Sequence, residues 1–394
     1  MPISRYLNNE RRLRFVVLLI PVLCIASLSV GLLYGFFRWW PVSEVMAAYR
    51  IHSTDWSIYD RMPNTPLSQE AVKDLITIHN LEDVVERRAR VIELIWKTRT
   101  LPEEAAERSA DIPIPAQFAD TPNLARIESL RVNLPLGFVS EAWHFVPKDA
   151  NGVVVIYHEG HDGGFEVLGA DMIKALLAQK YAVVGMSMPM SGRNRHPAYI
   201  TTQRFGPIRI RSHENLSLLE TEAFSPLVLF LDPPVKIVNW IKREGLYRKI
   251  AMMGISGGGW TTTLIAALDP RIDASYPVAG SLPFYLRSVL NANSWGDYEQ
   301  HFLPLYQIAT YEELYVMASV GAGRRQIQLF NAYDDCCFMT IAAEHYGPTV
   351  TKLAAEMGGA FDVFIYRSSY QHAVSPVARA EIIQDLGVTM RVAP

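Results

Sequence analysis

The sequence has few cysteines, little net charge and no cluster of basic residues, and each absence excludes a class of protein. Three cysteines in 394 residues are too few for a small fold held together by disulfides. A formal net charge of -3, with no stripe of lysine or arginine, gives no basis for nucleic-acid binding. Charged residues make up 20% of the chain against 49% hydrophobic residues, a balance that suits a packed globular protein with a membrane segment.

A long stretch without any charged residue runs from residue 15 to residue 37. As a helix that rises about 1.5 Å per residue it would measure roughly 34 Å, enough to cross a bilayer. Four arginines precede it between residues 5 and 14, whereas Arg38 is the nearest positive charge after it. The positive-inside rule therefore predicts a cytoplasmic N-terminus, residues 1–14, and places the remainder on the periplasmic or extracytoplasmic side.

A cleaved signal peptide is the alternative interpretation of this stretch. The apolar run is longer than the usual core of a signal peptide, and residues 34–39 offer no small-residue cleavage site. A lipoprotein is disfavoured because Cys24 lacks the small preceding residue that lipidation requires. We predict a retained single-pass anchor over residues 15–37.

The rest of the chain separates into a helical region and an α/β region. Residues 38–125 are predicted to be mostly helical, a spacer or a cover, with the clearest helix at 81–96 and Asn80 as its N-cap. From residue 126 to 394 apolar strands and amphipathic helices alternate, after an antiparallel hairpin around residues 135–137. The pattern predicts an α/β fold whose mostly parallel sheet has helices on both faces.

A glycine-rich turn between a predicted strand and a predicted helix is the strongest local signal. The apolar residues 250–253 lead into GISGG at residues 254–258, and apolar residues at helical spacing follow. Small neighbours allow a serine to take the strained conformation of so sharp a turn, which exposes its hydroxyl at the carboxyl edge of a parallel sheet. We therefore predict that Ser256 is a nucleophile and that the N–H of Gly257, at the start of the helix, binds an oxyanion.

A serine nucleophile needs a base, and the base needs an acid that orients it. One predicted strand ends just before Asp334 and Asp335, and the next ends before a loop that carries His372. These positions bring both groups to the sheet edge of Ser256, in the chain order that this architecture requires. His345 also follows the aspartates, but it lies in a predicted helix, so we predict His372 as the base.

The glycine-rich turn, the aspartate pair and the late histidine together resemble the α/β-hydrolase superfamily from residue 126 to the C-terminus. Residues 267–280 are similar to bacterial esterases of the acetyl-esterase and dienelactone-hydrolase kind. Residues 188–192, MPMSG, depart from the Asp-Xaa-Xaa-Gly loop of that group. The superfamily pattern favours Asp335 over Asp334 as the acid, with the neighbour capping the following helix.

The resemblance also implies a second oxyanion donor in the loop after the predicted strand 152–157. Aligning Gly160 with the glycine of the family favours the backbone N–H of His161, and Glu159 is the other candidate. His158 and His161 could instead be zinc ligands, but they are three residues apart in a glycine-rich turn and not on one face of a helix. We therefore predict no metal site and no cofactor.

Two further features have alternative interpretations. An aromatic insertion at residues 281–322 is predicted to be a lid or a pocket wall, and the alternative is ordinary packing. Cys336 and Cys337 follow the aspartates, and a vicinal disulfide outside the cytoplasm competes with two reduced thiols, which are commoner.

The sequence thus predicts a membrane-anchored serine esterase with Ser256, Asp335 and His372 as its triad. Its substrate is expected to be a small-molecule or carbohydrate ester, an O-acetyl ester by the looser resemblance. Acyl transfer or peptide hydrolysis on the same triad is one alternative. A catalytically silent scaffold that recruits a membrane partner through its N-terminal helices is another.

Overall fold

The computed structural model describes residues 20–31, 42–161, 163–290, 295–368 and 370–391. The chain divides into two units, Met1–Ile58 and Tyr59–Pro394. In the first unit residues 20–31 form a helix, and α2 spans Val42–Ser53. Among the described residues no helix has both the length and the apolar character needed to cross a membrane. Residues 15–19 and 32–37 of the predicted anchor lie outside the described residues.

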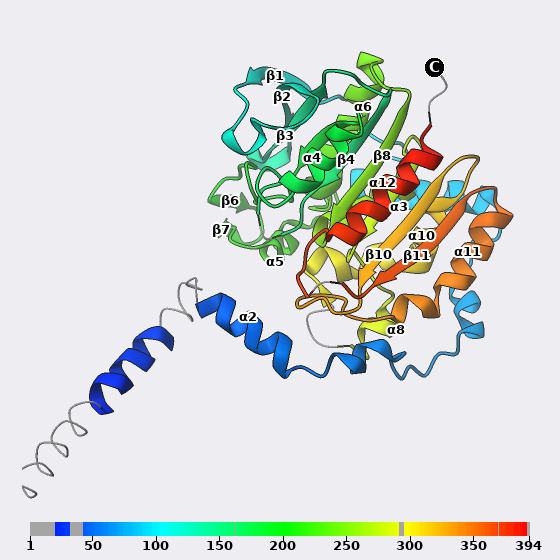
Figure 1. The fold of residues 1–394 in the computed structure, drawn as a ribbon. Helices are drawn as coiled ribbons and strands as arrows, with labels where there is room; N and C mark the ends of the chain where they lie inside the picture. The colour runs from blue at the N-terminus through cyan, green and yellow to red at the C-terminus, as the bar shows by residue number, and fades with distance from the viewer. Residues whose placement is uncertain (1–19, 32–41, 162, 291–294, 369, 392–394) are drawn as a thin grey trace, which may run out of the picture. The chain divides into compact units, whose positions relative to one another are not determined.

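The second unit is built on a sheet of nine strands in the order β1-β2-β3-β5-β4-β8-β9-β10-β11, with a separate β6-β7 hairpin (Figure 1). The strands are β1 Glu107–Ile112, β2 Leu124–Asn133, β3 Val139–Pro147, β4 Val153–His158, β5 Ala182–Met186, β6 Tyr199–Thr202, β7 Gly206–Arg209, β8 Lys249–Ile255, β9 Ala274–Val278, β10 Arg325–Asn331 and β11 Ala360–Tyr366. The pairs from β5 through β11 are parallel, and β1, β2 and β3 are antiparallel. The predicted hairpin and the mostly parallel sheet are both confirmed.

The sheet begins earlier than the hairpin that the sequence pattern indicates. Strand β1 lies within the region predicted to be mostly helical and pairs with β2. Its residues are polar and mostly exposed, so they lack the apolar alternation by which a strand is recognised. Residues 59–125 belong to the same compact unit as the sheet.

The α-helices follow the predicted alternation with the strands. They are α3 Leu81–Trp96, α4 Ala170–Ala178, α5 His213–Leu216, α6 Val228–Glu244, α7 Gly257–Leu268, α8 Phe284–Arg287, α9 Leu303–Tyr306, α10 Tyr311–Ser319, α11 Gly347–Glu356 and α12 Pro376–Thr389. Asn80 caps α3 as predicted, because its side chain accepts hydrogen bonds from the N–H groups of Glu82 and Asp83.

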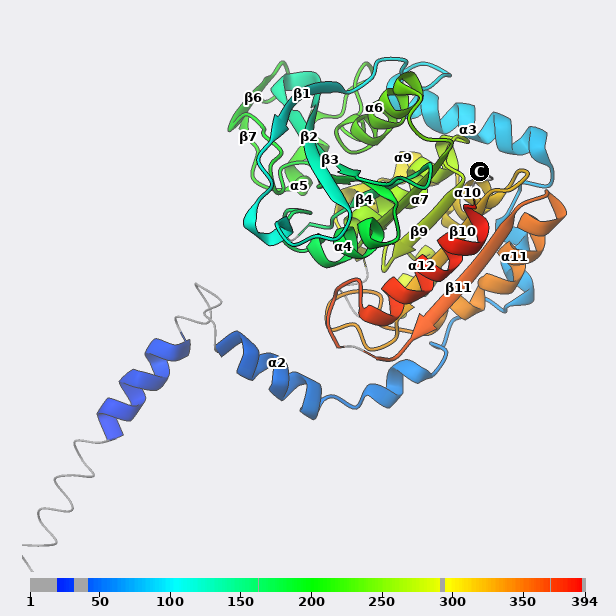
Figure 2. The same cartoon turned by 45° about the horizontal axis from the view of Figure 1, so that its top comes forward.

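The sheet has a core on each face. Val154 and Ile156 of β4 belong to the core that also holds α3, α6, α7 and α10. The alternate residues Val153 and Val155 belong to the core with α4 and α12. Figure 2 shows this layering from a second direction, with α4 and α12 on one side of the sheet. The predicted covering of both faces is therefore confirmed.

The aromatic insertion contributes to the first of these cores. Four of its tyrosines are buried, and the hydroxyl of Tyr306 accepts a hydrogen bond of 2.8 Å from the indole of Trp260 in α7. Arg287 is fully buried among its aromatic rings and donates to the carbonyl of Leu282. Much of the insertion is thus packed as core, and its role as a lid stays a prediction.

Candidate active site

Ser256 occupies the turn between β8 and α7. Its φ of 56° and ψ of -123° lie in a region that few residues with a side chain adopt. Hydrogen bonds from both backbone groups of Ser256 hold it in this conformation. Its N–H donates to the carbonyl oxygen of Val278 at 2.9 Å, and its carbonyl oxygen accepts from the N–H of Trp260. The side chain is partly exposed. This is the sharp strand-to-helix turn that the glycine pattern predicts.

The glycines around Ser256 are needed because the chain segments approach very closely. A β-carbon at Gly258 would lie 2.2 Å from the carbonyl oxygen of His158. A β-carbon at Gly160 would lie 2.9 Å from Cβ of Ser256 and 3.5 Å from its Oγ. The loop after β4 therefore lies directly against the serine turn, with no space for a larger residue.

His372 lies on the loop after β11 and contacts the aspartate pair that follows β10. Its ring Nδ1 is 2.8 Å from Oδ2 of Asp334. Asp335 instead accepts a hydrogen bond of 3.1 Å from the backbone N–H of His372. The expected contact of Asp335 with the imidazole is therefore made by Asp334. The reason is local: the turn after β10 points the first carboxylate inward, where it is 2% exposed, and leaves the second only partly buried.

The second oxygen of Asp334 is held by the next turn of the chain. Oδ1 accepts hydrogen bonds from the N–H groups of Cys336 and Cys337, at 2.8 and 3.0 Å. These two cysteines form a disulfide, so the expectation of two reduced thiols is wrong for this structure. Asp334, which was expected to cap a helix, binds the two amides of the disulfide turn with one oxygen and the histidine with the other.

The loop after β4 contains the predicted second oxyanion donor. The N–H of Glu159 donates to Met186 O at 2.9 Å, and the N–H of Gly160 donates to the Glu159 carboxylate. Both amides are engaged in the fold, which leaves the amide of His161 as the candidate donor in this loop. The His161 ring lies against the serine turn, since a β-carbon at Gly257 would be 2.3 Å from its Cε1 and 2.7 Å from its Nδ1.

His158 and His161 are not a pair of zinc ligands. The ring of His158 is buried, and its Nδ1 is 2.8 Å from the carbonyl of Glu159. Burial lowers the pKa of His158 to about 4, which keeps this imidazole neutral at pH 7. His161 points elsewhere, toward residues far away in the sequence.

A cluster of two histidines and two carboxylates surrounds the ring of His161. Its Nε2 lies 3.0 Å from Glu299 Oε1 and 3.2 Å from Asp297 Oδ2. His213 approaches the same carboxylates with its Nδ1, at 3.4 Å from Asp297 and 3.7 Å from Glu299. The four residues come from the loop after β4, from α5 and from the insertion, so neighbouring positions in the sequence carry no signal of the cluster.

The charges of this cluster are strongly coupled. Burial lowers the pKa of His213, but Asp297 and Glu299 outweigh it and raise that pKa to about 10. Burial likewise raises the pKa of Glu299, but the two histidines outweigh it and lower that pKa to about 2. The neighbours of His213 thus favour its protonated form, and those of Glu299 favour its ionised form.

Asp60 connects the loop that carries Asp334 with the loop that carries His372. Its carboxylate accepts hydrogen bonds from the hydroxyl of Tyr333 at 2.7 Å and from the guanidinium of Arg367 at 2.5 Å. The hydrogen bond from Arg367, followed by that from Tyr333, lowers the pKa of Asp60. Tyr333 precedes Asp334 in the chain, so this contact helps to place the acid turn.

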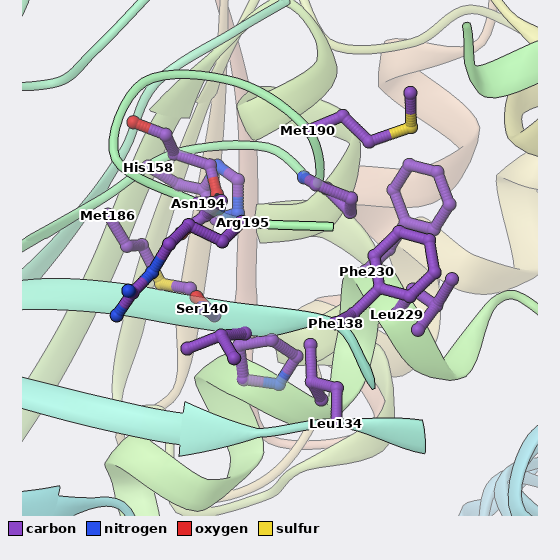
Figure 3. A pocket seen from close by; sticks show the side chains of 14 residues that line it. Leu134, Phe138, Ser140, His158, Met186, Met190, Asn194, Arg195, Leu229 and Phe230 are labelled. Carbon is purple, nitrogen blue, oxygen red and sulfur yellow. The ribbon is translucent and has the colours of Figure 1, made fainter. Parts of the chain in front are cut away.

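Figure 3 shows a small pocket near the first strands of the parallel sheet. Ser140, His158, Asn194 and Phe230 are among its lining residues, and Ser256 is not. Its cavity of about 10 Å³ has room for about one water molecule. The pocket is therefore too small to bind an ester substrate.

Comparison with solved structures identifies the fold. The acetyl xylan esterase from Paenibacillus sp. R4 matches with a TM-score of 0.53 at 17% identity, over 82% of this chain and 99% of that chain. Methylesterase BT1017 matches with a TM-score of 0.55 at 13% identity, over 82% of this chain and 70% of that chain. This chain has an α/β-hydrolase fold. Comparisons of the sequence with family models and with curated proteins find no match.

In this α/β-hydrolase fold, Ser256 follows β8, Asp334 follows β10 and His372 lies on the loop after β11. These three strands run in parallel. Their carboxyl ends therefore lie at one edge of the sheet. Sequence reasoning kept Asp334 and Asp335 as alternatives and favoured Asp335, whereas the ring of His372 contacts Asp334. It missed Asp60, His213, Asp297 and Glu299 altogether. For Asp334 the sequence did carry a signal, because this carboxylate directly follows a predicted strand. No comparable pattern marks the other four residues.

Proposed function

We propose that this chain is a serine hydrolase that cleaves a carboxylic ester through an acyl-enzyme intermediate. One observation carries the proposal: Ser256 is held at positive φ on the turn after β8, and the hydrogen-bonded pair of His372 and Asp334 follows parallel strands of the same sheet. A strained serine with its hydroxyl at this edge is the usual arrangement of a nucleophile. The likeness to solved esterases supports the fold on which the proposal rests.

In the proposed reaction the Oγ of Ser256 attacks the ester carbonyl carbon while Nε2 of His372 takes the hydroxyl proton. Asp334, on Nδ1, keeps the imidazole in the required tautomer and stabilises its positive charge. The amides of Gly257 and His161 hold the oxyanion. The carbon–oxygen bond to the alcohol then breaks, and the alcohol leaves with the proton from His372. Water, deprotonated by the same histidine, releases the acid and restores the serine.

For the substrate we propose an ester with a small acyl group. One matched structure is named an acetyl xylan esterase, and an acetyl ester has a small acyl group; the other is named a methylesterase, and in a methyl ester the small group is the alcohol. An O-acetyl group on a carbohydrate fits this class. Hydrolysis of p-nitrophenyl acetate should accordingly be faster, by kcat/KM, than hydrolysis of the octanoate.

We also propose that residues 15–37 anchor the chain in a membrane, with the N-terminus in the cytoplasm and the catalytic unit on the other side. The support is the charge-free stretch and the arginines before it. In its described part, residues 20–31, the large apolar side chains are exposed, for example Leu28 at 66%. Exposed apolar groups on all sides of a helix suit contact with lipid.

A fluorophosphonate probe tests the proposed hydrolase on the folded full-length protein. We expect covalent labelling of the wild type, and we expect Ser256→Ala to abolish both labelling and turnover of p-nitrophenyl acetate, with kcat lower by at least about 10³-fold. Ser368→Ala is the matched control, because Ser368 is exposed on the loop that carries His372. Folded wild-type protein that does not react with the probe would favour the silent scaffold, and labelling that survives Ser256→Ala would refute the nucleophile.

A further inference from the structure

The cluster of His161, His213, Asp297 and Glu299 is left unused by the proposed hydrolase. We propose that these four residues bind one zinc ion beside the oxyanion loop. The potential ligand atoms are Nε2 of His161, Nδ1 of His213 and one carboxylate oxygen each of Asp297 and Glu299, all within 4.8 Å of one another. Two imidazoles and two carboxylates make a ligand set that Zn²⁺ accepts.

Four of the six distances between these ligand atoms lie near those around a tetrahedral ion. Zinc–ligand bonds of about 2.0–2.2 Å put tetrahedral ligand atoms about 3.3–3.6 Å apart. The four distances between nitrogen and oxygen are 3.0, 3.2, 3.4 and 3.7 Å. Two of the four exceed the usual length of a hydrogen bond, so a cluster held by hydrogen bonds alone would leave His213 poorly satisfied.

Two buried atoms in this cluster are unsatisfied within the described part of the chain. Nδ1 of His213, a proposed ligand atom, has no hydrogen-bond partner there, and neither has Oε2 of Glu299, the oxygen beside the Oε1 that lies near the histidines; the two residues are only 6% and 0% exposed. Among the described residues neither Asp297 nor Glu299 forms an ion pair with lysine or arginine. The partners of the buried Glu299 carboxylate are thus the two imidazoles, and a metal ion held between the imidazoles and the carboxylates would offset the cost of burying the negative charge.

The surroundings of His213 are those of a metal ligand. Its other ring nitrogen, Nε2, lies 2.8 Å from the carbonyl oxygen of Pro189. A carbonyl can only accept, so Nε2 keeps its proton, and release of the other ring proton to make room for a metal ion would leave a lone pair on Nδ1, which faces the carboxylates. Ligating histidines usually donate their other N–H to a carbonyl or carboxylate in this way.

The ion would connect three segments at the serine turn. His161 belongs to the loop after β4, His213 begins α5, and the carboxylates come from the aromatic insertion. With Nε2 of His161 bound to zinc, its proton is on Nδ1, in the ring edge that lies against Gly257. The metal thereby acts as a positioning element for the oxyanion loop. Its binding does not depend on the proposed hydrolase, because it is measured without turnover.

The test measures zinc binding to the full-length chain without a polyhistidine tag. The protein and its Ser256→Ala variant are stripped with a chelator, reloaded with Zn²⁺, desalted and assayed for metal by mass spectrometry. Affinity is measured by competition with a chromophoric chelator. We expect one zinc per chain in both proteins, and a melting temperature that rises with zinc concentration.

The ligand variants are His213→Gln and Asp297→Asn, and we expect each to weaken zinc binding by at least about tenfold. Asp297 is 44% exposed, so its variant keeps the fold even where the histidine variant does not. His345→Gln is the matched control, because His345 is also 6% exposed but lies outside the cluster, and it should bind zinc like the wild type.

Three outcomes would overturn the zinc site. One is wild-type protein that retains less than about a tenth of an equivalent of zinc. The second is His213→Gln and Asp297→Asn proteins that bind as tightly as the wild type. The third is zinc that is lost from a Cys336→Ser, Cys337→Ser protein, since this places the ion on the cysteines and His372.

Discussion

At the scale of single residues, two adjacent carboxylates in this protein have different partners. Asp334 is buried and binds the ring of His372, whereas Asp335 binds the backbone N–H of the same histidine. In the proposed reaction the first contact would hold the imidazole in the required tautomer, and the second positions the backbone of the loop. The direction of one turn therefore gives two neighbouring aspartates different hydrogen-bond partners.

Substitution of each aspartate in turn tests this difference. Asp334→Asn should lower kcat for p-nitrophenyl acetate by about 10³ to 10⁴-fold, because an amide cannot stabilise the imidazolium and favours the wrong tautomer. Asp335→Asn should lower kcat by less than about tenfold, because an amide oxygen still accepts the backbone hydrogen bond. Steady-state kinetics on both folded variants distinguish the two aspartates. A larger loss of kcat for Asp335→Asn than for Asp334→Asn would assign the acid role to Asp335.

Glycine at the serine turn is also explained at the residue scale. A β-carbon at Gly258 would meet the carbonyl oxygens of His158 and Glu159 at 2.2 and 2.6 Å. Gly387, by contrast, is exposed in α12, and a β-carbon there would meet nothing within 4 Å. Substitution of glycine by alanine should therefore lower the free energy of unfolding at position 258 and raise it at position 387.

We expect Gly258→Ala to lower the free energy of unfolding by about 2–4 kcal/mol, because two backbone segments must separate. Gly387→Ala should raise it by up to about 1 kcal/mol, since alanine favours a helix interior. Urea unfolding midpoints measure both changes. Equal stabilities of the Gly258→Ala protein and the wild type would contradict the close approach of the loop after β4.

At the scale of elements, the hairpin of β2 and β3 has a histidine–carboxylate pair at its centre. Glu128 and His144 are directly opposite in the register, and the His144 ring is 2.8 Å from the Glu128 carboxylate. Arg126 adds a hydrogen bond of 2.9 Å to the same carboxylate. The hydrogen bond from His144, against the effect of burial, lowers the pKa of Glu128 to about 2.

This pair makes the stability of the sheet depend on pH. Because the pKa of Glu128 is lower in the folded chain than in the unfolded chain, its contribution is fully present above about pH 4.5 and is lost as the pH falls through about 2. We expect Glu128→Gln to cost on the order of 2 kcal/mol at pH 7. Urea unfolding should show a smaller difference from the wild type at pH 3, and a difference that does not change with pH would contradict the pair.

At the scale of the whole molecule, the sheet and the segment before it form one unit. Strand β1 and helix α3 belong to the compact part, residues 59–394, together with Asp60 and its contacts to the acid and base loops. Residues before 59 belong to another unit. The catalytic unit should therefore tolerate removal of the N-terminal segment.

A chain that begins at residue 59 tests the division and the proposed anchor together. We expect full-length protein to remain in the membrane fraction after a carbonate wash, because the proposed anchor, residues 15–37, would be inserted in the bilayer. The shortened chain should be recovered without detergent and should still react with a fluorophosphonate probe. Full-length protein released by carbonate would contradict the anchor, and a shortened chain that does not fold would contradict the division at residue 58.

What the sequence by itself determined is local and periodic. The parallel strands, the hairpin around residues 135–137 and the strained turn at Ser256 each depend on a few neighbouring residues, so apolar alternation and glycine spacing predict them. Strand β1 was missed because its polar residues lack that alternation.

Only the tertiary structure decided the contacts between segments that are distant in the sequence. The choice of Asp334 over Asp335 depends on the direction of a turn against the loop of His372. The cluster around His161 gathers residues from three segments as far apart as 138 positions. Side chains brought together by folding share no period or spacing along the chain, so their partners follow only from the packed fold.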